Sequence, residues 1–148
     1  YLTSKISLVK TDQEPNPPIR YIQKLPKRKI VVLIEGIFFF RNKSQINSAL
    51  SFCGNLLDKQ DLVYCVSYDE KIKSTAVFKK LTTYFEEVMH SEGNPYTVLP
   101  HSYYDNLPEF NHIDRFSSLE LAKQFNCLDG SVMEENILNE YFYKLQKK

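Results

Sequence analysis

The sequence has no tryptophan, only three cysteines and only four glycines, and the shortage of glycine already limits its chemistry. A phosphate-binding loop needs closely spaced glycines, because backbone amides must approach the anion at a helix N-terminus. Neither G-x-G-x-x-G nor G-x-x-x-x-G-K-S/T occurs in the chain. We therefore expect no bound cofactor and no dinucleotide or nucleoside-triphosphate site of the common kinds.

The cysteines, Cys53, Cys65 and Cys127, are far apart in the chain and odd in number. No C-x-x-C spacing occurs, which argues against both a zinc site and a disulfide framework. We interpret all three as buried small hydrophobic residues of a protein from a reducing compartment.

An excess of charge of one sign is also lacking, since 19 lysines and arginines face 18 acidic residues. This balance gives no general reason to expect a nucleic acid or an anionic membrane as partner. No apolar run reaches the roughly 18 residues of a membrane helix. Because the chain begins with Tyr1 rather than Met, we interpret it as a soluble fragment that attaches to a membrane, if at all, through a missing N-terminal segment.

The length of 148 residues favours one domain with its own hydrophobic core. Residues 1–26 contain "TDQEPNPPIR", whose three prolines disfavour both a helix and an interior strand. We predict a flexible leader or linker over 1–26, followed by a single α/β domain over 27–148.

The strongest local pattern is the apolar run within "KRKIVVLIEGIFFF", Lys27 to Phe40, which is typical of a strand buried on both faces. Similar runs predict further strands, and apolar residues spaced three to four apart predict helices. The predicted strands are 29–35, 61–67, 96–100 and a short one at 126–128, and the predicted helices are 45–57, 74–90, 117–125 and 131–148. Their alternation predicts a three-layer Rossmann-like sandwich with a small, mainly parallel sheet.

Two predicted helices begin with the pattern of a capping box, in which a serine precedes a glutamate by three residues. These pairs are Ser117 with Glu120, and Ser131 with Glu134. On the last helix, the apolar face would consist of Ile137, Leu138, Tyr141, Phe142 and Leu145.

The segment 101–116, "HSYYDNLPEFNHIDRF", has no periodicity, and we predict a long loop there. Its aromatic side chains either complete the core or contact a partner, since aromatic residues supply much of the binding energy of interfaces. We name the loop and the start of the next helix as the candidate partner surface. The candidate residues are Tyr103, Tyr104, Phe110, Ile113, Phe116 and Leu119.

An alternative function is a divalent-metal-dependent nuclease, because Glu35, Asp69 and Asp105 follow the three predicted strands. "VVLIEG" also looks like the first strand of nucleases of the PIN and NYN type. Those families usually place Asp at the strand end, and their later Asp-rich motifs are not recognisable here. We favour a solvated strand end for Glu35 and a helix cap for Asp69.

Nucleophilic catalysis has no recognisable motif. None of His90, His101 and His112 adjoins a G-x-S-x-G elbow, and we interpret them as surface or loop histidines. We therefore expect no catalytic residues and no enzymatic activity.

The order of the predicted elements resembles the soluble domain of the peroxin-22 family. The resemblance covers about residues 29–125 and is carried by "KIVVLIE", "LVYCVSYD", "YTVLPHS" and "IDRFSSLELAKQF". Its most particular piece is "YC-x-S-x-D", Tyr64 to Asp69. The predicted helix 74–90 is longer than expected from the family, and the C-terminal helix is more extended.

This resemblance implies a Rossmann-like adaptor without a cofactor site or catalytic residues. It implies an anchor at the peroxisomal membrane, with the domain facing the cytosol. The domain would recruit and stimulate a ubiquitin-conjugating enzyme as a monomer or 1:1 heterodimer, supporting receptor ubiquitination and recycling in matrix protein import. It would bind no nucleic acid, and Glu35 and Gly36 would form the end of a scaffold strand.

Overall fold

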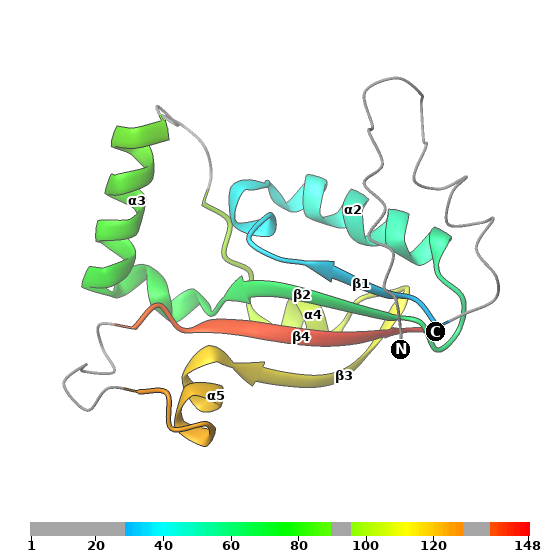
Figure 1. The fold of residues 1–148 in the computed structure, drawn as a ribbon. Coiled ribbons are helices and arrows are strands. Elements are labelled where there is room, and N and C mark those ends of the chain that lie inside the picture. The colour runs from blue at the N-terminus through cyan, green and yellow to red at the C-terminus, as the bar shows by residue number, and fades with distance from the viewer. Residues whose placement is uncertain (1–28, 90–95, 129–136) are drawn as a thin grey trace, which may run out of the picture.

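The structure is a computed structural model that describes residues 29–89, 96–128 and 137–148, and it forms an α/β domain (Figure 1). The predicted leader lies outside these residues. The strands are β1 (Val31–Ile34), β2 (Leu62–Tyr68), β3 (Phe110–Ser117) and β4 (Glu140–Lys147). The helices are α2 (Lys43–Leu56), α3 (Ala76–Met89), α4 (His101–Asp105) and α5 (Ser118–Gln124), with short 3-10 turns η1 (Phe38–Phe40) and η2 (Glu70–Ser74).

The four strands form one open, mixed sheet in the order β1-β2-β4-β3. β1 pairs with β2 in parallel, whereas β4 is antiparallel to both β2 and β3. The prediction of a mainly parallel sheet is therefore wrong, because only one of the three strand pairings is parallel.

The C-terminal helix predicted for 131–148 is also wrong, since its second half forms the central strand β4. Tyr141, Tyr143 and Leu145 alternate along β4 toward the face that holds the main core, and period two is the signature of a strand. The predicted capping residues Ser131 and Glu134 lie outside the described residues.

Of the other predicted strands and helices, five are confirmed and two are wrong. Strands and helices occur near 29–35, 45–57, 61–67, 74–90 and 117–125, and Ser117 forms its capping box with Glu120. The predicted strand 96–100 is absent from the sheet, although the Thr97 amide donates to the Phe39 carbonyl over 3.0 Å. The short strand at 126–128 is absent as well, and Asn126 has a left-handed φ of 52° that ends α5.

The segment 101–116 is not a long loop, because it forms α4 and most of β3. The alternation along β3 is interrupted between His112 and Asp114, where the pairing with β4 shifts register. A β-bulge of this kind inserts one extra residue, which hides the period-two pattern from a reading of the sequence.

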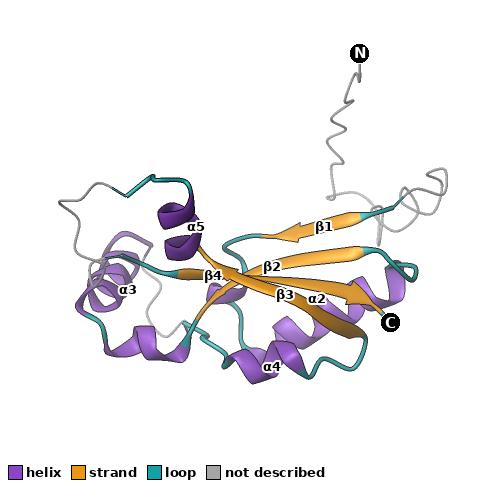
Figure 2. Cartoon of the chain, turned by 90° about the horizontal axis from the view of Figure 1, so that it is seen from below, coloured by secondary structure: helices purple, strands orange, loops and turns teal. Residues whose placement is uncertain are grey.

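The main core lies between the sheet and the helices α2 and α4, which share one side of it (Figure 2). Ile46, Leu50 and Cys53 of α2 pack against Val63 and Cys65 of β2, together with the rest of this buried cluster. A smaller aromatic cluster is centred on Phe39, which stacks on Tyr96 at 4.9 Å and meets Phe78 edge to face.

The predicted burial of the cysteines is confirmed for two of the three. Cys53 and Cys65 are buried and free, and burial raises the pKa of both thiols. Cys127 is exposed, so its predicted burial is wrong.

The opposite side of the sheet carries α5 near one end, away from α2 and α4 (Figure 2). At the β1 end of this outer face, Val31 is 56% exposed and Leu33 is 62% exposed. The run that suggests burial on both faces is thus covered on one face only, by packing of Val32 and Ile34 against the main core.

Candidate functional site

The structure separates the six candidate partner residues into a buried group and a surface group. Tyr104 and Phe110 are buried, with 0% and 1% of their surface exposed. Tyr104 stacks on the equally buried Tyr143, with ring centres 3.8 Å apart. Both residues complete the core, so neither is available to a partner of the folded domain.

Tyr103 is half-buried and connects α4 to α2. Its hydroxyl donates to the Asn47 side-chain oxygen over 2.6 Å, and the Lys43 ammonium lies 5.8 Å from its ring centre. Burial raises the pKa of Tyr103 to about 12. These contacts favour a structural role for Tyr103.

The remaining candidates reach the surface. Ile113 is 47% exposed at the β3 bulge, whereas Phe116 and Leu119 are half-buried. Phe116 stacks on Phe142 of β4 at 5.3 Å, with the rings only 12° from parallel. The register places both rings on the outer face of the sheet.

Helix α5 begins directly after β3 and lies near both β3 and β4, so it adds apolar side chains at the same end of the sheet. Its capping box fixes its start at Ser117, yet none of its side chains is buried. Phe125, at its C-cap, is 67% exposed. We call Phe116, Leu119, Phe125 and Phe142 the α5 surface. Phe125 and Phe142 were absent from the sequence-based candidates, because Phe125 ended a predicted helix and Phe142 lay on another.

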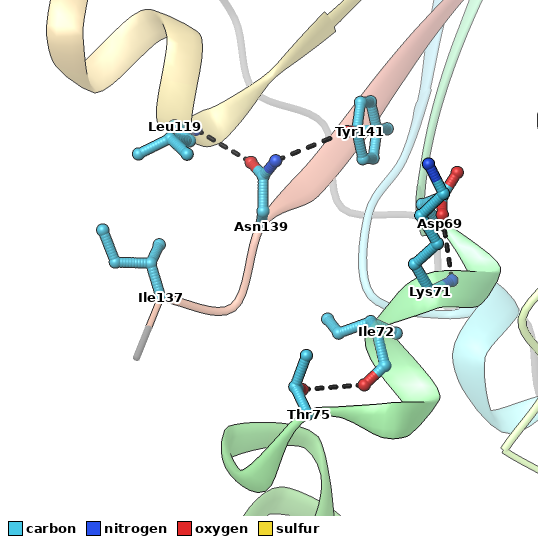
Figure 3. A pocket seen from close by; sticks show the side chains of 8 residues that line it. All are labelled: Asp69, Lys71, Ile72, Thr75, Leu119, Ile137, Asn139 and Tyr141. Atoms are coloured by element: carbon cyan, nitrogen blue, oxygen red, sulfur yellow. Dashed lines mark hydrogen bonds between the residues drawn. The ribbon is translucent and has the colours of Figure 1, made fainter. Parts of the chain in front are cut away.

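Leu119 also lines a pocket of about 340 Å³ between η2 and the start of β4 (Figure 3). The Asn139 side-chain oxygen accepts hydrogen bonds from the Leu119 amide and the Ser118 hydroxyl, which holds α5 against β4. The lining mixes apolar side chains with polar groups. The lining residues are Asp69, Lys71, Ile72, Thr75, Leu119, Ile137, Asn139 and Tyr141.

Asp69 at this pocket begins a chain of polar side chains that continues into the core. The His101 Nε2 atom lies 2.7 Å from the Asp69 carboxylate, and its Nδ1 atom lies 2.7 Å from the Tyr143 hydroxyl. Burial, and to a lesser degree the charge of Arg115, lowers the pKa of His101. A neutral His101 that donates from Nε2 to Asp69 accepts at Nδ1 from the Tyr143 hydroxyl.

This arrangement has the bonding order of an acid, a base and a hydroxyl, but the hydroxyl is inaccessible. Tyr143 is fully buried, and burial raises its pKa. A substrate cannot reach its oxygen in the folded domain, so Asp69, His101 and Tyr143 form a structural tie between the start of η2, α4 and β4. His101 and His112 are both partly buried and bonded to carboxylates, which corrects their interpretation as surface histidines; His90 lies outside the described residues.

The three carboxylates of the nuclease alternative are engaged differently. Glu35 is exposed after β1, Asp69 caps η2 and contacts His101, and Asp105 lies 2.9 Å from His112. Asp69 thus has the helix-cap role that the sequence favours. Among the residues that the structure describes, no three acidic, histidine or cysteine side chains form a group able to hold a metal ion.

No protein-family model matches this chain, and no curated protein matches its sequence. None of the helices in the described ranges combines the length and apolar character of a membrane-spanning helix. We therefore infer a binding surface from the geometry described above.

Proposed function

We propose that this chain is a non-catalytic adaptor that binds, recruits and stimulates a ubiquitin-conjugating enzyme at the peroxisomal membrane, with the domain facing the cytosol. In this role it supports receptor ubiquitination and recycling during matrix protein import. The observation that carries the proposal is the α5 surface, where Phe125 is 67% exposed and no side chain of α5 is fully buried. Partly exposed apolar side chains near an exposed aromatic residue are typical of protein-binding surfaces.

The resemblance to the peroxin-22 family supplies the identity of the partner. Five elements of that resemblance, β1, α2, β2, α3 and α5, follow one another in the expected order. The third expected strand and the aromatic loop depart from it, since 96–100 is outside the sheet and 101–116 forms α4 and β3. We further propose a three-layer Rossmann-like arrangement, in which α5 belongs to the second helical layer.

Stimulation in this proposal arises from binding alone. A partner that contacts the α5 surface at a place remote from its catalytic cysteine can shift between conformations of unequal affinity for the adaptor. The adaptor then donates no catalytic group, and we expect it to bind the enzyme in a 1:1 ratio.

Calorimetric titration of the full chain with the peroxisomal ubiquitin-conjugating enzyme tests the proposal. We expect Phe125→Ala and Leu119→Ala each to weaken binding about tenfold or more, because truncated apolar anchors of an interface commonly cost at least 1.4 kcal/mol. Tyr84→Ala is the matched control, since Tyr84 is a 57% exposed aromatic residue on α3. Equal affinities for all three variants, with circular dichroism spectra unchanged, would reject the α5 surface.

The same titration addresses the nuclease alternative. Magnesium or manganese is titrated into the chain without the enzyme, and RNA cleavage is measured in parallel. Metal binding accompanied by cleavage that Glu35→Gln abolishes would replace the adaptor proposal with a nuclease that uses Glu35, Asp69 and Asp105.

A further inference from the structure

The first strand leaves one edge of the sheet open. β1 pairs with β2 on one side, and no strand in the described ranges pairs with its other side. The Ile30 carbonyl accepts from the Leu62 amide over 3.0 Å, so Ile30 points its backbone groups at β2. Because these directions alternate along a strand, Val31 and Leu33 point their amides and carbonyls to the open edge.

Side chains along this edge are also exposed to solvent. Val31 and Leu33 are 56% and 62% exposed on the outer face of the sheet. Exposed opposite charges flank them, with Lys29 before β1 and Glu35 after it. β1 itself has no proline and no charged residue, and its pairing with β2 has no register shift.

We propose that this edge pairs with β1 of a second copy of this chain. The two strands run antiparallel around a two-fold axis at Val32. In this register Val31 lies opposite Leu33 of the second copy. The two residues form a hydrogen-bonded pair, in which the amide and carbonyl that each points to the open edge bond to those of the other. The pairing joins two four-stranded sheets into one sheet of eight strands.

Charge favours the same register. Lys29 lies opposite Glu35 of the second copy, and the two-fold axis repeats this attraction at the other end of the strand. Residues 29, 31, 33 and 35 share one face because side chains alternate along a strand, so the apolar pairs lie between the two charged pairs. A surface that complements itself in this way fits the isologous interface of a two-fold dimer.

The contact is small, because β1 has only four residues. We therefore expect reversible association with a dissociation constant of about 10 µM to 1 mM. Sedimentation equilibrium of the full chain across that concentration range measures it. A monomer at every concentration overturns the proposal. This holds even if another part of the chain or a different protein pairs with the β1 edge.

Charge reversal tests the register. We expect Lys29→Glu and Glu35→Lys each to weaken self-association roughly tenfold, because two attractive cross-strand pairs become repulsive. The double variant restores the attraction and hence the wild-type dissociation constant. Lys79→Glu, an exposed change of equal charge on α3, should leave self-association unchanged. A double variant as weak as the single ones overturns the proposal, because only pairing of β1 with itself predicts the rescue.

This inference is independent of the proposed function. The α5 surface lies on the β3 and β4 side of the sheet, at the other end of the strand order from β1. The charge reversals should therefore leave affinity for the ubiquitin-conjugating enzyme unchanged.

Discussion

The two edges of the sheet are built in opposite ways. β3 is eight residues long, carries a bulge between His112 and Asp114, and exposes the charged residues Asp114 and Arg115. β1 is four residues long, regular and apolar. Bulges and charges on an edge strand prevent it from pairing with other chains. The β3 edge is thus protected, and the β1 edge is open to a further strand.

The edges also differ in how they are attached. β3 pairs with β4 over nearly its whole length, whereas β1 has four paired residues and one side-chain anchor. That anchor is the buried Asp61, whose carboxylate accepts from the Ile30 amide at 2.8 Å and the Asp58 amide at 2.9 Å. β1 is therefore held by its pairing with β2, by the packing of Val32 and Ile34 against the main core, and at its start by the Asp61 carboxylate.

The largest expected effect comes from removing this anchor. Asp61→Ala leaves two backbone amides without their charged acceptor, and we expect it to lower the free energy of unfolding by about 3 kcal/mol. Urea denaturation measures the loss. Asp58→Ala is the control, because Asp58 is exposed and contributes only its amide to this contact. Similar stabilities of the two variants would show that pairing with β2 alone holds β1.

A smaller effect should distinguish the edges directly. Leu33→Lys places a charge on the open edge, and we expect it to weaken self-association more than tenfold, since it replaces an apolar contact at both symmetric positions. The matched change on the protected edge is Ile113→Lys, which should leave self-association unchanged. Because both side chains are about half exposed, stability should change by about 0.5 kcal/mol or less. Equal weakening by both variants would contradict the difference between the edges.

The sequence predicts the elements that depend on local signals. These signals are the apolar run of β2, the buried stripe of α2 and the capping box at Ser117. The residues that form each signal are close together in the sequence, and all three predictions are confirmed. The strands of the protected side were missed for another reason. Tyr141 and Leu145 fit both a helical spacing of four and a strand spacing of two, and pairing with β2 and β3 decides between them.

The candidate site was predictable only in part, because exposure depends on packing between distant segments. Tyr104 and Phe116 belong to the same aromatic segment, yet Tyr104 is stacked in the core and Phe116 on the outer face. The run "KIVVLIE" also predicts burial on both faces, and no local feature of it indicates that Val31 and Leu33 are exposed.

The smallest expected effect concerns the tie between His101 and the centre of the sheet. Burial lowers the pKa of His101 below its ordinary value of 6.5, with Arg115 and Lys71 acting in the same direction and the carboxylates of Asp69 and Asp105 opposing them. In the pH range between the lowered pKa and 6.5, the unfolded chain binds more protons at this residue than the folded domain does. Stability from this group is therefore present above pH 6.5 and is lost as the pH falls through that range.

A comparison of wild type with His101→Gln isolates this contribution, because glutamine does not titrate. Thermal unfolding between about pH 7.5 and pH 5 should show a steeper loss of stability for the wild type. The two edges should respond unequally, since the tie holds Tyr143 of β4, which pairs with β3 and does not adjoin β1. Hydrogen exchange should then increase in β3 and β4 before β1, and parallel pH profiles for the two proteins would show that His101 is not the titrating group.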